Sequence, residues 1–380
     1  MQRRTFLIKQ RVLITGGAGF IGSFLTDALI EKGYNVSIFD NLEKQVHHGK
    51  KPPYINKKAT LVRGDVRSYD SLKRAVLDAD IVFHLAARVG VGQANYQIKD
   101  YVDTNIGGMA NLLDIIVNEK TKVKKIIMTS SMTSYGEGMY SCSKHGKQKI
   151  RMRPDSQMIT KQWELLCPTC KEILTPIPTP ESAELQDNGI YSIGKHVQEQ
   201  LLLFIGKMYR IPVVSLRLFN VYGPRQSLSN PYTGVAAIFI SRLKNNRQPI
   251  VFEDGGQTRD FVSVHDVVNA LLLAMENADA DYSVFNIGSG KPTSVKTIAT
   301  TLAKLLKKDI TPSITNDGRK GDIRHCFADA SKAEKILGWK PHVSFEEGMK
   351  EVVSWSEKED ARDIFERAAG ELSEKKLMYE

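Results

Sequence analysis

Short apolar segments alternate with longer amphipathic segments over the first 218 residues of the chain. The short segments predict β-strands, because runs rich in valine and isoleucine between polar or glycine-rich stretches are typical of buried strands. The longer segments carry apolar residues at helical spacing. The predicted strands are residues 12–15, 36–40, 60–64, 81–86, 125–130 and 213–218, and the predicted helices are residues 21–32, 71–77, 104–118 and 192–209.

This alternation predicts an α/β fold of the Rossmann type, with a doubly wound parallel sheet covered by helices on both faces. Beyond residue 219 the pattern is less regular, although residues 261–277 and 285–288 are apolar enough to return to the sheet. The expected parts are a dinucleotide-binding domain over residues 1–218 with an insertion at about 138–180, a smaller and mainly substrate-binding lobe over 219–355, and a charged C-terminal surface helix within 356–380.

Composition limits the classes of protein that the chain can represent. Of its 380 residues, 42% are apolar and 25% are charged, which excludes disordered, collagen-like and coiled-coil proteins. Because no apolar run reaches the roughly 18 residues of a membrane span and the first nine residues do not form a signal peptide, we expect a cytoplasmic protein without membrane contact. The net charge of +10 favours an anionic partner, either a nucleic acid or a phosphorylated small molecule.

A glycine-rich turn follows the first predicted strand, residues 12–15, and opens the first predicted helix. Gly16 permits the tight turn, Gly19 lets the backbone approach a pyrophosphate, and Gly22 lets helix and strand pack closely. The free N–H groups at the start of the helix attract the anion. Asp40 ends the second strand, where a carboxylate accepts from a ribose 2′-hydroxyl and repels a 2′-phosphate, so the pattern predicts NAD over NADP.

Tyr191 and Lys195 lie four positions apart, on one face of a predicted helix. A neighbouring ammonium stabilises a phenolate and lowers a tyrosine pKa, which makes the tyrosine a usable base. The pair comes after a dinucleotide-binding half and after a strand that ends next to Ser131, and ligands of such sheets bind at the carboxyl ends of the strands. The position of the pair predicts a catalytic role.

With these motifs the chain resembles the extended short-chain dehydrogenase/reductase family, in its nucleotide-sugar epimerase branch. Further matching segments are Gly-Asp-Val-Arg at 64–67, His-Leu-Ala-Ala at 84–87 and Asn-Val-Tyr-Gly-Pro-Arg at 220–225. The resemblance implies catalysis by Ser131, Tyr191 and Lys195. The cofactor-binding residues that it implies are Gly16, Gly19, Phe20, Ile21, Gly22, Asp40, Asn41, Asp65, Val66, Leu85, Ala86, Ala87, Asn105, Tyr191 and Lys195.

The resemblance also implies a nucleotide-diphosphate sugar as substrate, bound by Ser131, Asn220, Arg259 and Arg324. The two arginines match family arginines that hold the diphosphate, a task that suits a planar guanidinium because it binds phosphate oxygens in pairs. Family members of this branch pair two helices across a homodimer. We therefore expect a homodimer formed through the predicted helices 104–118 and 192–209.

The mechanism that the family implies begins with Tyr191, which takes the proton from a sugar hydroxyl while Ser131 hydrogen-bonds the same oxygen and hydride leaves for NAD. Family dehydratases carry an Asp-Glu pair directly after the catalytic Ser or Thr. Here Met132 and Thr133 occupy those positions and cannot transfer the required protons, so we reject that dehydratase. The remaining route is 4-epimerisation, with hydride returned to the other face and NAD retained.

Residues 41–47, residues 231–234 and the insertion look most like the subgroup of dTDP-L-rhamnose 4-epimerases, which make dTDP-6-deoxy-L-talose. Two other enzyme activities stay open. One is a UDP-hexose 4-epimerase acting on glucose and galactose or on a uronate, and the other is a nucleotide-4-keto-sugar reductase.

The insertion contains three of the four cysteines of the chain. Cys142 and His145 form a Cys-x2-His pair, and Cys167 and Cys170 form a Cys-x2-Cys pair after 21 intervening residues. Two short-spaced pairs of soft ligands predict a tetrahedral, structural zinc site. Basic residues at 144–153 also leave open a non-enzymatic alternative, an NAD-sensing nucleic-acid binder, although the intact catalytic residues make nucleic acid the less favoured partner.

Overall fold

The computed structural model describes residues 10–379 of the chain. The prediction that the first nine residues form no signal peptide lies outside the described residues. Within 10–379, no helix combines the length and the apolar character that a membrane crossing requires. The cytoplasmic location stays a prediction.

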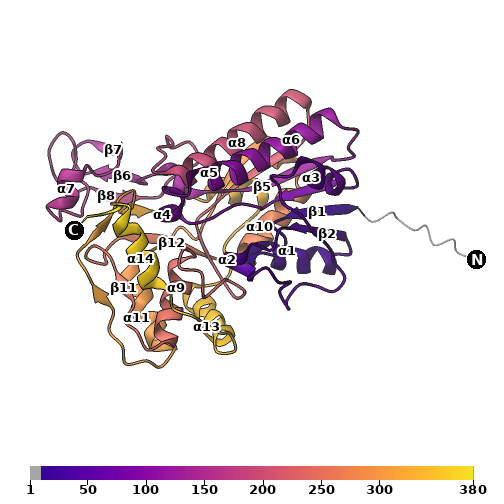
Figure 1. The fold of residues 1–380 in the computed structure, drawn as a ribbon. Coiled ribbons are helices and arrows are strands. Elements are labelled where there is room, and N and C mark those ends of the chain that lie inside the picture. The colour runs from indigo at the N-terminus through magenta and orange to yellow at the C-terminus, as the bar shows by residue number, and fades with distance from the viewer. Residues whose placement is uncertain (1–9, 380) are drawn as a thin grey trace, which may run out of the picture.

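Seven parallel strands form the central sheet, in the order β13-β9-β5-β4-β1-β2-β3 (Figure 1). Every position of β4, β5 and β9 is buried, which explains why these strands read as continuous apolar runs. The predicted α/β fold with a parallel sheet is confirmed. The strands are β1 (Arg11–Thr15), β2 (Asn35–Asp40), β3 (Thr60–Arg63), β4 (Ile81–His84), β5 (Lys125–Ser131), β9 (Val213–Leu218) and β13 (Ser283–Ile287).

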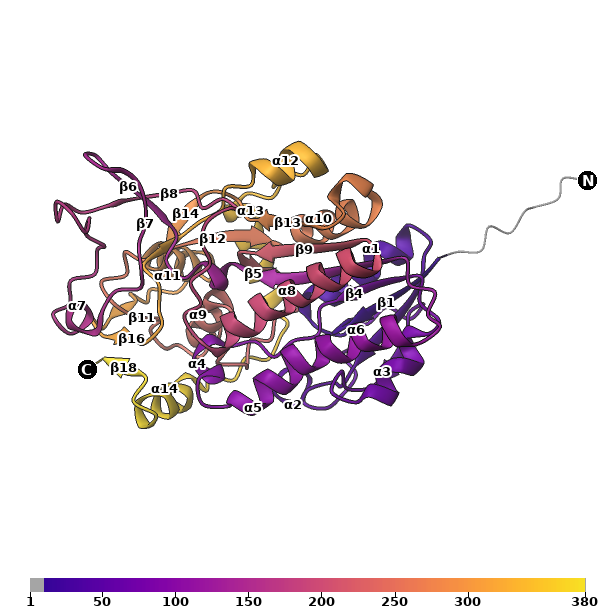
Figure 2. The ribbon, with the colours of Figure 1, turned by 90° about the horizontal axis from the view of Figure 1, so that it is seen from above.

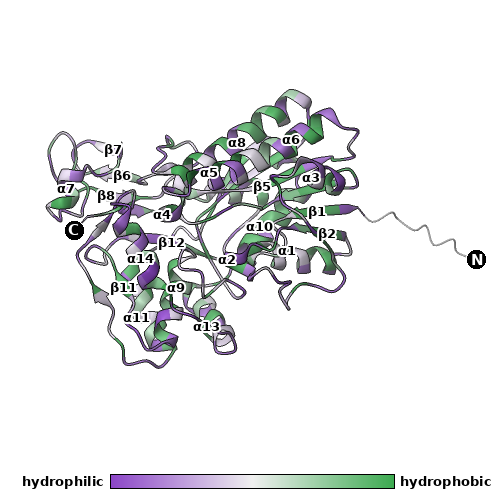
Figure 3. Ribbon diagram, in the orientation of Figure 1, coloured by the Kyte–Doolittle hydropathy of each residue, from purple (hydrophilic) through white to green (hydrophobic). Residues whose placement is uncertain are grey.

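Helices cover both faces of this sheet. Successive residues of a strand point to opposite faces, so Ile14 packs with α1 (Phe20–Glu31) and α10 (Val264–Glu276), whereas Leu13 packs with the helices of the other face. Those helices are α3 (Tyr69–Val76), α6 (Gly108–Asn118) and α8 (Ile190–Tyr209). Figure 2 shows α6 and α8 side by side along that face, and Figure 3 shows green apolar and purple polar residues mixed along both helices.

The predicted helix over residues 104–118 begins differently from the prediction. It starts as a π-helix, η1 (Val102–Gly107), which continues directly into α6 and follows the short helix α5 (Ile98–Tyr101). A π-helical turn has the same apolar periodicity as the start of an α-helix over so few residues, so the sequence pattern did not reveal it. Asn105 lies inside this turn.

The second lobe has its own small sheet and its own core. Its strands are β10 (Asn220–Tyr222), β12 (Thr258–Ser263), β14 (Pro292–Ser294) and β17 (His325–Cys326), and its main helices are α9 (Val235–Lys244), α11 (Val295–Leu305) and α13 (Phe345–Ser356). Apolar side chains of these helices, among them Phe239, Ile298 and Val352, form a separate cluster. Of the two segments expected to return to the central sheet, one supplies β13, and the other supplies β12 of the small sheet and α10.

The insertion folds into a three-stranded antiparallel sheet, in the order β7-β6-β8, and a short helix. Its elements are β6 (Met139–Cys142), β7 (Gly146–Lys149), α7 (Asp155–Ile159) and β8 (Thr175–Ile177). It lies at the left of Figure 1, beside the C-terminus. The chain ends with α14 (Phe365–Glu374) and β18 (Met378–Tyr379), and β18 pairs with β16 (Gly318–Arg319) of the second lobe.

Candidate functional site

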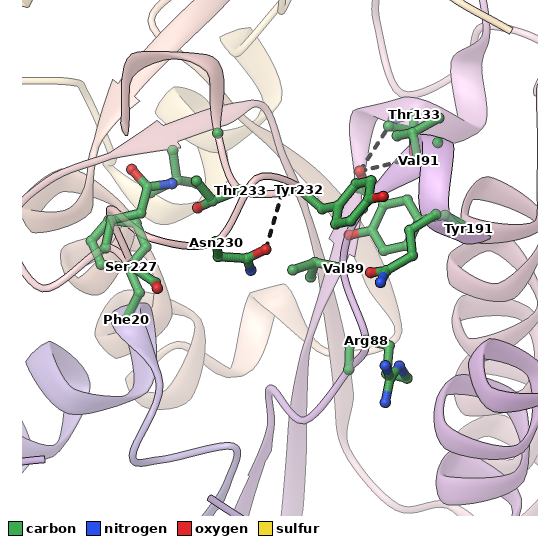
Figure 4. A pocket seen from close by; sticks show the side chains of 18 of the residues that line it. Phe20, Arg88, Val89, Val91, Thr133, Tyr191, Ser227, Asn230, Tyr232 and Thr233 are labelled. Atoms are coloured by element: carbon green, nitrogen blue, oxygen red, sulfur yellow. Dashed lines mark hydrogen bonds between the residues drawn. The ribbon is translucent and has the colours of Figure 1, made fainter. Parts of the chain in front are cut away.

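A cavity of about 650 Å³ runs between the carboxyl edge of the central sheet and the second lobe. Both lobes line it, together with the C-terminal helix α14 (Figure 4). A ligand cavity at this edge is the usual arrangement for a doubly wound sheet. The predicted cofactor residues that line the cavity are Gly16, Gly19, Phe20, Ile21, Gly22, Asp40, Asn41, Asp65, Val66, Leu85, Ala86, Ala87, Tyr191 and Lys195.

The glycine-rich turn leaves room only for a bare backbone. Gly16 has a φ of +70°, and a Cβ atom there would lie 2.8 Å from the backbone nitrogen of Ala86. A Cβ atom on Gly22 would lie 2.4 Å from the carbonyl oxygen of Gly16. The residue before α1, Gly19, provides no side-chain cap, so the first N–H groups of the helix are available to an anion in the cavity. These residues fit the pyrophosphate of a dinucleotide.

Asp40 lies at the end of β2, where its carboxylate is buried and held in place. Its Oδ2 accepts from the backbone nitrogen of Ala18 at 3.0 Å, and its Oδ1 accepts from that of Leu42 at 2.8 Å. Burial raises the pKa of Asp40, and the two backbone hydrogen bonds and His47 oppose that rise. The position fits a ribose of the cofactor.

A second carboxylate lies farther along the same edge. Asp65 accepts hydrogen bonds from Asn41 at 3.0 Å and from the guanidinium and backbone nitrogen of Arg67 at 2.8 and 2.9 Å. Partial burial opposes ionisation of Asp65, but these hydrogen bonds lower its pKa to about 2. Asp65 is therefore a fixed anion at the cofactor end of the cavity.

The first turn of α8 brings the predicted catalytic residues together with the end of β5. Lys195 is 3% exposed, and its Nζ donates to the carbonyl oxygen of Thr129 at 2.9 Å. Ser131 is the last residue of β5, and its Oγ accepts from the backbone nitrogen and the hydroxyl of Thr133 at 3.2 and 3.0 Å, the dashed lines at the upper right of Figure 4. The side chains of Ser131 and Tyr191 also share a hydrogen bond.

The electrostatics of the pair differ from the sequence expectation. Burial raises the pKa of Tyr191 to about 12, and the hydrogen bond with Ser131 only partly opposes that rise. Burial also lowers the pKa of Lys195 to about 8. We expected Lys195 to lower the tyrosine pKa, but here its ammonium is directed at a backbone carbonyl, and removal of both groups from water dominates.

His84, at the end of β4, is a buried neutral neighbour of this pair. Its Nδ1 hydrogen-bonds the hydroxyl of Thr15 at 2.9 Å, and its Nε2 has no hydrogen-bond partner among the described residues. Burial, reinforced by the charge of Lys195, lowers the pKa of His84 to about 3. His84 therefore carries no charge at neutral pH and does not compete with Tyr191 for the role of base.

Asn105 does not line the cavity, and this corrects its predicted role as a cofactor contact. Its side chain is fully buried in the π-helical turn, where Oδ1 accepts from the backbone nitrogen of Arg88 at 2.8 Å and Nδ2 donates to the carbonyl oxygen of Arg88 at 3.2 Å. Residues 85–88 line the cavity. Asn105 thus holds the cofactor-lining segment in position from behind.

Two of the three substrate residues in the second lobe reach the cavity. Asn220 and Arg259 line it, and the buried Oδ1 of Asn220 has no hydrogen-bond partner among the described residues, so it can accept from a ligand. The guanidinium of Arg259 donates to the carbonyl oxygens of Ile323 at 2.7 Å and of Arg324 at 3.1 Å. Arg259 is thereby fixed beside the cavity.

Arg324 does not reach the cavity, which corrects the expectation that it holds a diphosphate. It is 2% exposed, and its guanidinium pairs with the carboxylates of Glu164, Glu253 and Asp254. A buried arginine bound by three carboxylates has no donors left for a phosphate. The contact between Arg324 and Arg259 described above makes Arg324 a support for Arg259.

The sequence analysis missed several cationic residues of the cavity. Arg88, Arg225, Arg319 and Lys320 all line it. Arg225 ends the 220–225 motif, so that pattern could have revealed it. Arg319 ends the short strand β16 and Lys320 follows it, and no sequence motif marks either residue. Because these side chains are positive, the cavity is suited to an anionic ligand.

The four predicted metal ligands gather in the insertion, away from the cavity. Their ligand atoms all lie within 4.8 Å of one another. Nδ1 of His145 lies 3.5 Å from Sγ of Cys142 and 3.4 Å from Sγ of Cys167, and the Sγ atoms of Cys142 and Cys170 are 3.6 Å apart. Tetrahedral zinc, with bonds of about 2.3 Å to sulfur and about 2.0–2.1 Å to nitrogen, sets its ligand atoms about 3.5–3.8 Å apart. The cluster therefore fits zinc.

Comparison with known proteins identifies the family. The chain matches the NAD dependent epimerase/dehydratase family over residues 12–157 and 168–288. It is 34% identical over 351 residues to a dTDP-L-rhamnose 4-epimerase of Burkholderia thailandensis, with 91% of this chain and 94% of that protein covered. It is also 34% identical over 349 residues to a putative UDP-glucose 4-epimerase of Methanocaldococcus jannaschii, with coverages of 90% and 97%.

Solved structures agree with this result. The UDP-glucose 4-epimerase of Thermotoga maritima, determined with UDP-glucose, superimposes with a TM-score of 0.76 at 34% identity, with 92% of this chain and 99% of that chain covered. The UDP-glucuronic acid 4-epimerase of Bacillus cereus, determined with UDP-glucuronic acid and NAD, gives a TM-score of 0.75 at 27% identity, with the same coverages. The chain belongs to the NAD dependent epimerase/dehydratase family, and the prediction of an enzyme of its nucleotide-sugar epimerase branch is confirmed.

We predict that Lys195→Met stabilises the protein and abolishes its activity. Below pH 8 the ammonium is present in both states, so the folded state carries the full cost of burying it, about 3 kcal/mol for a pKa lowered from 10.5 to about 8. The gain in unfolding free energy is therefore present at pH 7, declines between pH 8 and 10.5, and is absent above that range. Chemical denaturation at several pH values measures it, with the exposed Lys207→Met on the same helix as the control. A gain that is independent of pH contradicts the explanation.

Proposed function

We propose that this chain is an NAD-dependent nucleotide-sugar 4-epimerase that converts dTDP-L-rhamnose to dTDP-6-deoxy-L-talose. The observation that carries the proposal is the convergence of Ser131, Tyr191 and Lys195 at the junction of two halves of one cavity. One half carries the glycine-rich turn and Asp40, and the other carries cationic residues of the second lobe. This arrangement holds a cofactor and an anionic sugar nucleotide on either side of the same reacting groups.

The residues after Ser131 support epimerisation over dehydration. Met132 and Thr133 line the cavity in place of the acid pair of the dehydratases. The thioether of Met132 transfers no proton, and the hydroxyl of Thr133 donates to Ser131. A reaction that needs no acid or base beyond Tyr191 is therefore favoured.

Tyr191 acts as the base for the hydroxyl at C4 of the sugar. Ser131, whose Oγ accepts from the backbone nitrogen and the hydroxyl of Thr133, has one O–H left to donate to the reacting oxygen. NAD, when bound, supplies the chemistry of accepting and returning a hydride at C4. Because burial raises the pKa of Tyr191 to about 12, this tyrosine is protonated at neutral pH. A positive charge near its hydroxyl lowers the pKa and makes the tyrosine a stronger base. Asp40 favours NAD over NADP by repelling a 2′-phosphate.

The choice of sugar rests on the similarity of the chain to the dTDP-L-rhamnose 4-epimerase of Burkholderia thailandensis. The equal identity to a putative UDP-glucose 4-epimerase keeps UDP-hexose 4-epimerisation as the second candidate. Both candidate activities use the same catalytic residues at C4, so they can be distinguished only by testing which sugar nucleotide the protein epimerises.

We predict that the purified protein, with no added cofactor, inverts C4 of dTDP-L-rhamnose, and that Tyr191→Phe lowers kcat by at least about 100-fold because the general base is lost. Proton NMR of dTDP-L-rhamnose, UDP-glucose, UDP-galactose and UDP-glucuronate, incubated separately, identifies the substrate. Tyr209→Phe, an exposed position at the other end of α8, is the matched control. Inversion of a UDP-hexose alone selects the second candidate. Consumption of added NADH by a 4-keto sugar, without C4 inversion, makes the protein a reductase.

We also propose that the insertion binds one structural zinc ion through Cys142, His145, Cys167 and Cys170. Four protein ligands leave no open coordination position, so the ion stabilises the insertion and takes no part in the reaction. The small core of the insertion consists of few apolar residues, among them Tyr140, Leu165 and Leu174, and two of the ligand cysteines belong to it. Such a small core depends on the metal for its stability.

We predict one zinc per chain by elemental analysis, and loss of that zinc in Cys167→Ser. Removal of the metal lowers the melting temperature and exposes the insertion to proteolysis, because folding of the insertion is coupled to metal binding. Cys326→Ser, at the cysteine outside the cluster, is the matched control and retains zinc. Full zinc content in Cys167→Ser rules out the proposed ligand set.

Three of the five lysine and arginine side chains in the basic run at 144–153 are engaged within the fold, which weakens the nucleic-acid alternative. Lys144 pairs with Glu172 at 2.6 Å. Arg153 is buried and pairs with Glu253 at 2.8 Å. Lys149 donates to backbone carbonyl oxygens.

We propose that the protein is a homodimer in which α8 packs against its copy. Phe204 and Met208 are 61% and 58% exposed on this helix, which is unusual for large apolar side chains. Light scattering coupled to size exclusion is predicted to give twice the mass of the chain, and Phe204→Glu to give a monomer. Ile159→Glu, at an apolar residue of the insertion that is 62% exposed, is the control and leaves the dimer intact. A wild-type monomer contradicts the proposal.

A further inference from the structure

The C-terminal helix α14 forms a wall of the cavity that the mechanism does not use. Phe365, Ala368, Ala369 and Leu372 all line the cavity. Their spacing of three and four residues puts them on one face of the helix. The wall that α14 presents is therefore entirely apolar.

A single carboxylate joins α14 to both lobes. Glu371 accepts hydrogen bonds from the hydroxyls of Tyr96 at 2.8 Å and Tyr232 at 2.7 Å, and these two hydroxyls are 2.6 Å apart. Tyr96 lies between α4 (Val91–Ala94) and α5 in the first lobe, and Tyr232 precedes α9 in the second. The hydroxyls of both tyrosines are thus committed to Glu371.

The start of the helix is fixed by a second set of ion pairs. The buried guanidinium of Arg242, on α9, contacts Asp363 at 3.3 Å and Glu366 at 2.9 Å. Arg247 contacts the same two carboxylates. With both ends anchored, the apolar face of α14 has a fixed position over the cavity.

Leu372 packs on a segment of the first lobe that also contacts the residue preceding Tyr191. A Cβ atom on Gly92 would lie 3.0 Å from Cδ2 of Leu372, so the side chain packs directly on α4. Asn95, which follows α4, accepts from the backbone nitrogen of Ile190 at 3.1 Å, and Ile190 directly precedes Tyr191. Val89 and Val91, which precede Gly92, line the same cavity as Tyr191 and Tyr232, and Figure 4 labels all four.

We propose that α14 is the wall of the sugar site that selects the substituent at C5 of the sugar, and that Leu372 makes the site prefer a methyl group over a hydroxymethyl group or a carboxylate. The proposal rests on the proposed function, which puts C4 of the sugar at Tyr191. The C5 substituent is then only two bonds from the reacting carbon and lies within reach of the adjacent walls.

The chemistry of the wall gives the direction of the preference. Leucine, alanine and phenylalanine side chains offer no hydrogen bond to a hydroxyl or a carboxylate that leaves water, and such an unpaired group is costly to bury. The nearby tyrosine hydroxyls are already bound by Glu371. A methyl group, in contrast, gains from burial against the same side chains.

The test compares dTDP-L-rhamnose with dTDP-L-mannose, which differs only by a hydroxyl group at C6. We expect the wild type to prefer dTDP-L-rhamnose in kcat/KM by about tenfold or more, and the near-isosteric Leu372→Asn to lower that preference by about tenfold. Ala369→Ser, which adds one hydroxyl to the wall with little change in volume, is expected to shift the preference in the same direction. Gly370→Ala is the matched control, because its added Cβ meets no atom within 4 Å and it lies outside the cavity lining.

An unchanged preference in two active variants, Leu372→Asn and Ala369→Ser, overturns the proposal. Glu371→Gln tests whether the position of α14 can be separated from its preference for one sugar. Weakening this anchor of the helix is expected to raise KM for both sugars alike and to change kcat less. If the wild type instead epimerises UDP-glucose, the proposed substrate is wrong, and the same wall must then favour the 6-deoxy form of UDP-glucose over UDP-glucose itself. A wild-type preference for the hydroxymethyl sugar of either pair overturns the inference.

Discussion

The parallel alignment of β1, β4 and β5 is the constraint on which the site depends. Val12 of β1 pairs with Ile81 of β4, and Ile81 pairs with Lys125 of β5, so the three strands end at the same edge. The chain leaves that edge as the glycine-rich turn, as the cofactor-lining segment 85–88 and at Ser131. Helix α8 then adds Tyr191 and Lys195 from its first turn. A shift in the register of one of these strands would move its end along the sheet and separate these groups.

Burial at that edge creates the main energetic tension in the molecule. An ammonium and an imidazole are buried beside the partly exposed phenol of Tyr191, with the pKa of Lys195 lowered to about 8 and that of His84 to about 3. The lowered pKa of Lys195 costs stability at neutral pH, because the ammonium loses its hydration in the folded state. The lowered pKa of His84 costs stability only below about pH 6.5, where the unfolded chain is protonated. The proposed reaction, in which C4 is oxidised and then reduced again, takes place beside these buried groups.

The parts of the site that follow from local sequence were predictable, and those that depend on distant contacts were not. The turn from Gly16 to Gly22 and the Tyr191–Lys195 spacing are set by a few neighbouring residues, and the structure brings both to the cavity. The Cys-x2-His and Cys-x2-Cys spacings likewise predict the cluster of four ligand atoms that the structure contains. Arg324 was misassigned because its three carboxylate partners come from 70 to 160 positions away in the chain.

The role of α14 was hidden for the same reason. Its sequence is charged and reads as a surface helix, but Leu372 is buried against Gly92, which lies far back in the chain, and Glu371 finds its two tyrosines in different lobes. The apolar spacing from Phe365 to Leu372 indicated a buried face without indicating what that face covers. The sequence motifs therefore predict the cofactor end of the cavity, but they do not reveal which distant segments form its other end.

In the proposed reaction, hydrogen leaves C4 as hydride and returns to the other face of the same sugar. The most direct test is to incubate the enzyme in ordinary water with dTDP-L-rhamnose that carries deuterium at C4, and to measure the isotope in the epimerised product by NMR and mass spectrometry. The account predicts dTDP-6-deoxy-L-talose with the deuterium retained at C4. Product in which the deuterium at C4 has exchanged with solvent hydrogen contradicts it.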